Sequence, residues 1–320
     1  MKVFITDTTL REGMQSPLLE LGYEKRRDLF HLLASVGVAE IEAGVPAHSE
    51  EERKYLKELI QGPEGDKVIV WNRANPKDLE FSFECGARRL EVAFPISDIM
   101  IEKKLGKGRS YVMKLLEELL PHVKSKGVYL SVGLEDGSRA DRDFLLSFAK
   151  RAKELGADRV RLSDTVGVLN PIKVRELVKE LSSFVEVEVH FHNDFGMATA
   201  NSVIAVLSGA KYVNASLLGV GERCGITPTE EVVYYLKFVE GIETGIDPKG
   251  LYQVIERFVA LTGIEVPKNK PIVGENAFTN KSSIHLDAMS KSRETYLPFD
   301  PKEIGREERV CMGLYSRGNT

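Results

Sequence analysis

The sequence is poor in cysteine, lacks an excess of either charge and has no long apolar run. Its 320 residues include three cysteines (Cys85, Cys224 and Cys311), too few and too widely spaced for a disulfide framework. Lysine and arginine number 44 against 48 acidic residues, so the net charge of −4 predicts no nucleic-acid partner and no membrane binding. No run approaches the roughly 20 apolar residues that span a bilayer, and the N-terminus turns polar after Ile5. These absences predict a cytoplasmic protein without a signal peptide.

What the sequence does contain is an alternation of short β-branched runs with longer amphipathic, charged segments. Eight such units of roughly 30 residues each predict an α/β fold of the (β/α)8 TIM-barrel type, in preference to a doubly wound open sheet. The expected strands are Val3–Thr6, Val38–Glu42, Lys67–Trp71, Arg88–Ala93, Val128–Val132, Asp158–Leu162, Val185–His190 and Tyr212–Ser216. The expected helices lie near 22–36, 50–60, 76–85, 110–126, 140–155, 171–183, 197–209 and 228–240.

The alternation stops after residue 245. One amphipathic helix near 248–262 precedes an irregular stretch whose prolines exclude a long helix. We therefore predict a TIM-barrel domain over residues 1–245 and a C-terminal helical and irregular extension over residues 246–320.

Polar side chains gather at the carboxyl ends of the predicted strands, where the active site of a TIM barrel lies. His190 and His192 are two residues apart on a strand, so both imidazoles would point to one face and offer two ligands to a metal ion. The alternative is a pair of histidines held only by hydrogen bonds. Glu12 follows another odd-numbered strand and is the expected third ligand, with Asp7 as the competing carboxylate. Such a set suits Mg²⁺, Mn²⁺, Zn²⁺ or Fe²⁺ and leaves positions open for substrate.

Other side chains at the same strand ends suit a reaction at such a metal. Arg11 precedes Glu12 and would stabilise an oxyanion that develops during reaction, unless it is an ordinary ion-pair partner. Glu135 ends the fifth predicted strand and is a candidate general base. Gly219–Gly225 lacks the spacing of a nucleotide-binding loop, and its Cys224 is expected to be a loop residue rather than a nucleophile.

Three motifs together resemble the DRE-TIM metallolyase superfamily: DTTLREGMQ at Asp7–Gln15, HFHND at His190–Asp194 and GVGERCG at Gly219–Gly225. Within it, the chain resembles the acyltransferase branch of 2-isopropylmalate, citramalate and homocitrate synthases. Further motifs, such as EIEAGVPA at Glu40–Ala47 and SDTVG at Ser163–Gly167, are most similar to the nitrogen-fixation type of homocitrate synthase. The resemblance covers essentially the whole sequence.

The resemblance implies a Claisen-type condensation of acetyl-CoA with a 2-oxo acid, followed by hydrolysis of the thioester. Glu12, His190 and His192 would hold the divalent metal (Mg, Mn or Zn), which would polarise the keto group. Arg11 would stabilise the alkoxide formed on attack, and Thr165 would bind the carboxylate of the acid.

The resemblance also implies a homodimer, in which the extension packs on the partner subunit over its barrel mouth. Glu135, together with His285 and Tyr296 of the second chain, would remove a proton from the acetyl methyl group, and which of the three takes the proton stays open. The remaining candidates, expected to position substrate or ligands, are Gln15, Asp7 and Glu42.

The preferred acid is 2-oxoglutarate, which would give homocitrate. Lysine-route homocitrate synthases bind its far carboxylate with an arginine where this sequence has Ser131, so Arg73 and His48 are the candidate replacements. Oxaloacetate, pyruvate and 2-oxoisovalerate are the alternative acids. A metal-dependent acyl-CoA lyase and a binding protein without turnover are the alternative classes. The sequence departs from the family pattern at Ile226, Asn280, Ser283 and Tyr315.

Overall fold

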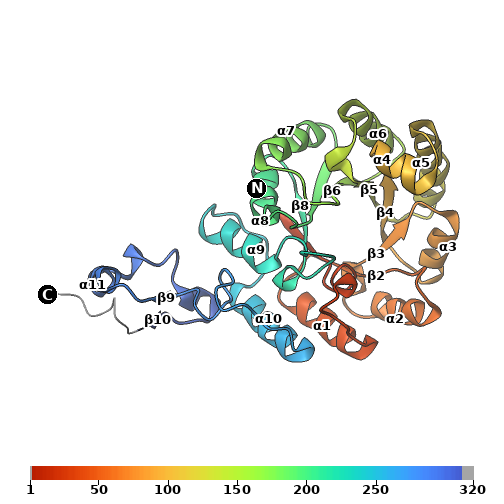
Figure 1. Cartoon of the computed structure of the whole chain (residues 1–320). Helices are drawn as coiled ribbons and strands as arrows, with labels where there is room; N and C mark the ends of the chain where they lie inside the picture. Colours follow the sequence, from red (N-terminus) through yellow and green to blue (C-terminus); the bar gives the residue numbers. More distant parts are fainter. Residues whose placement is uncertain (1, 312–320) are drawn as a thin grey trace.

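Eight parallel strands close into a barrel, which confirms the predicted fold class (Figure 1). The computed structural model describes residues 2–311. Each strand pairs with the next along the sequence, and β8 pairs with β1 to close the ring. The strands of the barrel are β1 (Phe4–Asp7), β2 (Glu40–Gly44), β3 (Val68–Arg73), β4 (Arg89–Pro95), β5 (Tyr129–Glu135), β6 (Arg159–Asp164), β7 (Glu186–Phe191) and β8 (Tyr212–Ala215).

Helices surround the barrel, and all those expected from the sequence are present within a few residues of the predicted bounds (Figure 1). The sequence analysis predicted no bounds for two helices: α4, which the Ser97 side chain caps in the connection from β4, and α11, which lies in the stretch expected to be irregular. Among the described residues, no helix combines the length and the apolar character needed to cross a membrane. The helices are α1 (Tyr23–Ser35), α2 (Glu50–Gln61), α3 (Pro76–Glu84), α4 (Asp98–Leu105), α5 (Arg109–Ser125), α6 (Arg142–Glu154), α7 (Pro171–Ser182), α8 (Ala198–Leu207), α9 (Thr229–Phe238), α10 (Pro248–Thr262) and α11 (Ser283–Lys291).

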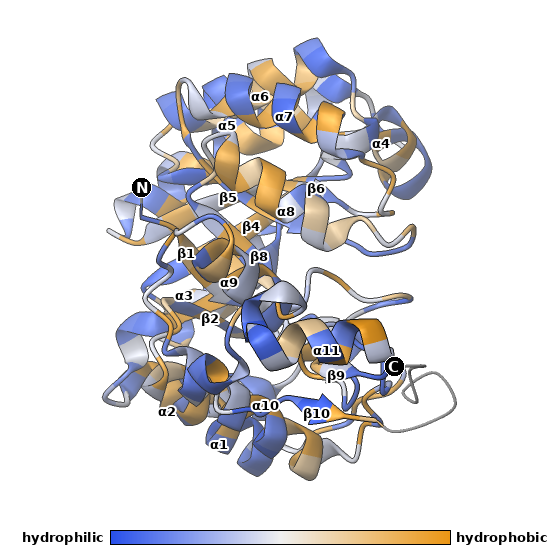
Figure 2. Ribbon diagram, turned by 90° about the vertical axis from the view of Figure 1, so that its left-hand side faces the viewer, coloured by the Kyte–Doolittle hydropathy of each residue, from blue (hydrophilic) through white to orange (hydrophobic). Residues whose placement is uncertain are grey.

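The apolar core lies between the strands and the helices, whereas the inside of the barrel is charged. Successive side chains of a strand point to opposite faces. In β6, Val160 and Leu162 therefore join the apolar core, while Arg159 and Arg161 lie among glutamates inside the barrel. Figure 2 shows hydrophobic and hydrophilic residues interspersed along the covering helices, as expected when only one face of each helix meets the core. This interior differs from the branched apolar layers that usually fill such barrels.

Arginine and glutamate alternate through this interior in a continuous run of ion pairs, which we call the ion-pair series. Its five inner links measure between 2.6 and 3.1 Å. The series begins near the amino ends of the strands and ends at the turn that follows β1. In order of contact, its members are Arg89, Glu40, Arg159, Glu188, Arg161, Glu42, Arg11 and Glu12.

Residues on both sides of α11 in the sequence anchor the extension to the barrel. The Phe299 ring stacks on Phe238 of α9 with centroids 4.2 Å apart, and Lys270 pairs with Glu230 and Glu231 of the same helix. Between Lys270 and Phe299 in the sequence, α11 buries none of its residues. The two-residue strands β9 (Thr279–Asn280) and β10 (Arg309–Val310) pair with each other, and Figure 1 shows them with α11 standing away from the barrel. The domain boundary at residue 245 stays a prediction.

The ion-pair series predicts an unequal effect of removing two arginines. Arg159→Met should lower the free energy of unfolding by about 3–5 kcal/mol, because Glu40 and Glu188 would keep buried charges without their partner. Arg151→Met removes a surface pair with Glu117 and should cost less than about 1 kcal/mol. Urea unfolding followed by circular dichroism measures both, and equal losses would contradict a structural role for the series.

Candidate active site

The three predicted metal ligands meet at the carboxyl end of the barrel. Glu12 lies in the turn after β1, His190 is in β7, and His192 follows that strand. One ligand atom from each lies within 4.8 Å of the others, and all three side chains are buried. The two Nε2 atoms are 3.3 Å apart, and Glu12 Oε1 is 4.0 Å from His192 Nε2. The spacing of the sequence motif therefore does bring two imidazoles and a carboxylate together.

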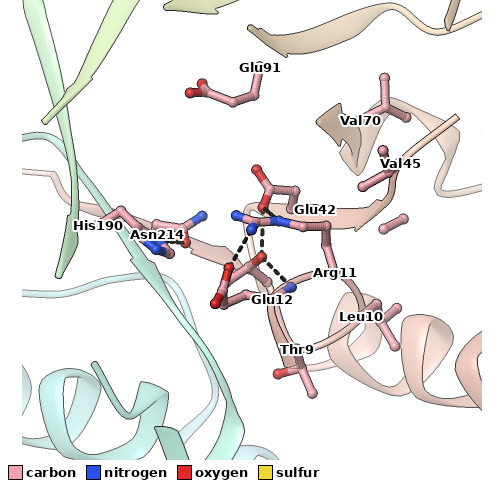
Figure 3. A network of polar contacts seen from close by, with 12 residues as sticks. Thr9, Leu10, Arg11, Glu12, Glu42, Val45, Val70, Glu91, His190 and Asn214 are labelled. Carbon is pink, nitrogen blue, oxygen red and sulfur yellow. Dashed lines mark hydrogen bonds and ion pairs between the residues drawn. The ribbon is translucent and has the colours of Figure 1, made fainter. Parts of the chain in front are cut away.

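The environment of the imidazoles fits a divalent cation. Asn214 Oδ1 accepts a hydrogen bond of 2.6 Å from His190 Nδ1 (Figure 3). This bond leaves the lone pair on His190 Nε2, the atom that faces His192 Nε2. Burial lowers the pKa of both His190 and His192 to about 4, so both rings are neutral at pH 7 and two nitrogen lone pairs are available. Two facing neutral nitrogens with a carboxylate are a donor set that a metal ion satisfies.

The loop after β8 fastens this end of β7. Ile226 forms a β-bridge with His192, and the Asn193 amide donates to the Gly225 carbonyl. The Glu222 amide donates to Glu12 Oε1 at 3.3 Å. Ile226, one of the positions at which the sequence departs from the family pattern, thus contributes through its backbone. Gly219–Gly225 supports the ligands.

Arg11 connects the ligand cluster to the barrel interior. Its Nη1 pairs with Glu12, and its Nε donates to Glu42 at 2.6 Å (Figure 3). Burial opposes the charge of Glu42, but Arg11 and Arg161 outweigh it and hold the pKa of Glu42 far below its usual value. Glu42 therefore stays ionised and holds the Arg11 guanidinium beside the cluster.

Asp7, the competing carboxylate, is occupied elsewhere. Its oxygens accept hydrogen bonds from the Thr9 amide at 2.9 Å and from the Thr229 hydroxyl at 3.1 Å. Burial raises the pKa of Asp7 to about 6. Glu12, and not Asp7, is thus the carboxylate that shares a site with the histidines.

A cavity of about 190 Å³ adjoins the three ligands and contains most of the other predicted site residues. Both oxygens of Glu135 accept hydrogen bonds from Lys104 Nζ, at 2.7 and 2.9 Å. Thr165 Oγ1 accepts one from the Asp136 amide at 2.9 Å. The predicted residues that line this cavity, which we call the ligand cavity, are Arg11, Glu12, Gln15, Glu135, Thr165, His190 and His192.

Besides Asp7 and Glu42, four predicted residues lie outside the ligand cavity. Arg73 and His48 line a neighbouring cavity of about 730 Å³, where Arg73 forms two hydrogen bonds with Asp78. His285 and Tyr296 stack on each other in the extension, with ring centroids 3.9 Å apart. Within the described residues of one chain, none of the four reaches the ligands. Asn280 and Ser283 also lie in the extension, and Tyr315 lies outside the described residues.

Sequence reasoning missed three residues that shape the site: Asn214, Glu91 and Arg161. Asn214 orients His190, while Glu91 and Arg161 line the ligand cavity. A signal was present, because β6 reads RVRLSD and β7 reads EVEVHF, with charges at every second position. Charged residues that share a face with a predicted ligand indicate an interior site rather than a solvated face.

Comparison with known proteins gives a consistent family assignment. The sequence model of the HMGL-like family matches residues 2–259, and that of the homocitrate synthase post-HMGL domain matches residues 272–319. "2-Isopropylmalate synthase 2" of Caldanaerobacter subterraneus subsp. tengcongensis is 40% identical over 98% of this chain and 82% of its own length. "Homocitrate synthase 1" of Nostoc sp. is 40% identical over 98% of this chain and 84% of its own. A putative (R)-citramalate synthase of Archaeoglobus fulgidus is 38% identical over 99% of this chain and 65% of its own.

Solved structures agree with the barrel fold. The HMG-CoA lyase of Bacillus subtilis superposes with a TM-score of 0.73 over 83% of this chain and 95% of that chain. Its sequence identity of 22% is evidence for the fold alone.

The contact between Asn214 and His190 predicts an indirect effect on metal binding. Asn214→Leu should weaken binding of Mn²⁺ to metal-free protein by about 10- to 100-fold, because it removes the acceptor that fixes the His190 ring. Titration calorimetry measures the affinity. Asn269→Ala, at an exposed position in the extension, is the control and should leave it unchanged. Unchanged affinity in the Asn214 variant would contradict this orienting role.

Proposed function

We propose that this chain, which belongs to the HMGL-like family and within it to the group of 2-isopropylmalate, homocitrate and citramalate synthases, condenses acetyl-CoA with a 2-oxo acid. The observation that carries the proposal is the buried cluster of Glu12, His190 and His192 beside a cavity that Arg11 also lines. A carbonyl compound that enters this cavity meets two imidazoles, a carboxylate and a guanidinium within one small volume.

Each residue of the ligand cavity would have a separate role in the condensation. Glu12, His190 and His192 would hold a divalent metal, which supplies a Lewis acid for the keto oxygen. Arg11 is held in place by Glu42 and offers a fixed cation to the oxygen that becomes an alkoxide. The Thr165 hydroxyl lies in the same cavity and would donate to the carboxylate of the acid. Glu135 would receive the methyl proton of acetyl-CoA, and Lys104 orients its carboxylate from α4.

The identity of the acid is a finer question. The resemblance favours 2-oxoglutarate, with oxaloacetate, pyruvate and 2-oxoisovalerate as alternatives. Relatives named for 2-isopropylmalate and for homocitrate are both 40% identical, so identity does not choose between them. Arg73 would have to leave Asp78, and the neighbouring cavity, to meet a far carboxylate.

The extension supports a site shared between two subunits. Its α11 buries no residue, and Ile284 in that helix is 74% exposed. His285 and Tyr296 form a stacked pair near it, so a second barrel placed against α11 would receive both side chains together. We therefore propose a homodimer in which each extension completes the active site of its partner.

Release of CoA tests the proposed reaction. With Mg²⁺ or Mn²⁺, acetyl-CoA and a panel of 2-oxo acids, the protein should release free thiol with at least one acid, and EDTA should abolish the release. His192→Ala should lower the rate to background without loss of fold, whereas His122→Ala, at the surface of α5, should not. If none of the acids leads to thiol release and the protein cleaves an acyl-CoA, it is a lyase instead.

Complementation between variants tests the shared site. His285→Ala and Arg11→Ala should each be inactive, and a mixture refolded together should recover up to about a quarter of the wild-type activity. This recovery is expected because a mixed dimer, about half of the population, holds one site with both residues intact. A mixture that stays as inactive as its components would contradict the exchange of extensions.

A further inference from the structure

One buried carboxyl group inside the barrel, that of Glu91, is not part of the ion-pair series. The ion-pair series pairs four arginines with four glutamates, so it is neutral as a whole. Glu91, in β4, is a fifth glutamate in the same interior and is 1% exposed. Its only ion-pair contact in the described structure is with Arg161, whose Nε lies 3.7 Å from Oε2. Glu91 is thus an extra acid beside a series that is already balanced.

Neither oxygen of Glu91 has a hydrogen-bond partner of good geometry in the described structure. Arg161 is committed to other acids, because its Nη1 donates to Glu42 at 2.7 Å and its Nη2 to Glu188 at 3.2 Å. Figure 3 shows the Glu91 carboxyl group apart from the Arg11, Glu12 and Glu42 contacts, with no interaction drawn to it. A buried carboxyl group without donors costs stability, which is consistent with a role in binding.

The backbone makes room for this carboxyl group. A Cβ atom at Gly133 in β5, the strand next to β4, would lie 2.3 Å from Glu91 Oε1. Burial raises the pKa of Glu91 to about 7, and the nearby charge of Glu188 adds to the rise. Arg161 and the Ser131 hydroxyl oppose this rise of the pKa. The position is therefore built to hold a carboxyl group that the protein itself does not satisfy.

Glu91 lines the same ligand cavity as the three metal ligands. An acid whose carboxylate and keto oxygens lie at the ligands must place the rest of its side chain in that volume, where Glu91, Trp71 and Ala93 form part of the wall. The two arginines that line the cavity in the described structure, Arg11 and Arg161, are both already paired with glutamates. Above its pKa Glu91 carries a negative charge, so a far carboxylate would then meet it without an unpaired cation to offset the repulsion.

Resting on the proposed function, we infer that the 2-oxo acid carries a hydrogen-bond donor, a hydroxyl or amino group, at its far end and that Glu91 accepts from it. Such a donor gives the buried carboxyl group the partner that the protein lacks. An apolar end would leave that group unsatisfied, and a carboxylate end would add a second negative charge next to it.

Three acids that differ at the far end test the inference: 4-hydroxy-2-oxobutanoate, oxaloacetate and 2-oxopentanoate. They end in a hydroxyl, a carboxylate and a methyl group at similar reach. Titration calorimetry at pH 8, where Glu91 is mostly ionised, with Mg²⁺ and without acetyl-CoA, should show the hydroxy acid binding at least about tenfold more tightly than either of the others. The thiol-release assay should give the same order in kcat/KM.

Two variants identify Glu91 as the source of the preference. Glu91→Leu should remove the advantage of the hydroxy acid and favour 2-oxopentanoate. Glu91→Gln should relieve the rejection of oxaloacetate, because the amide carries no charge. Glu84→Gln, an exposed acid in α3, is the matched control and should keep the wild-type order. The wild-type comparison stands even if a Glu91 variant fails to fold.

The two readouts separate this inference from the proposed function. If the hydroxy acid binds best but no acid releases CoA, the condensation is wrong and the far-end recognition stands. If CoA is released and oxaloacetate or 2-oxopentanoate is preferred in both readouts, the condensation stands and the inference is overturned. An unchanged order of the three acids in Glu91→Leu would also overturn it.

Discussion

The ion pairs inside the barrel are the interaction on which the stability of the interior and the position of the site residues depend. Burying an arginine or a glutamate alone is costly, and each inner member of the ion-pair series avoids this cost by contacting two partners of opposite charge. The series leaves few alternative arrangements, because moving one member would leave two others without a partner. It ends at Arg11 and Glu12, so the charges that stabilise the interior also hold the first two residues of the site.

This coupling explains how the active site gains precision although several of its residues come from loops. Glu12 lies in a turn and His192 follows the end of β7, where backbone freedom is greatest. Glu12 is held by Arg11 and by the Glu222 amide, and the bridge to Ile226 holds His192. Preorganised ligands of this kind do not have to be gathered when a cation or a substrate arrives.

The sequence predicted the fold and the ligand cluster, because both follow from local pattern. Alternation of strands and helices predicted the barrel, and the two-residue spacing of His190 and His192 placed both rings on one face. The positions of the Arg73 and His48 side chains could not be predicted in this way. Proximity to a strand end does not say which of two adjoining cavities a long side chain enters, and Arg73 instead pairs with Asp78. Within the extension, α11 buries none of its residues, so only an assembly can define the role of this helix.

The two ends of the ligand cavity differ in the interactions that their buried groups lack. Glu12 closes the ion-pair series and shares Arg11 with Glu42, while both histidines beside it are neutral, so this end favours a cation. At the other wall, Glu91 has no donor of good geometry. Elsewhere in the series, every buried charge has an opposite partner close by. Two unmet interactions therefore adjoin the ligand cavity, where bound groups would supply a cation at one end and a donor at the other.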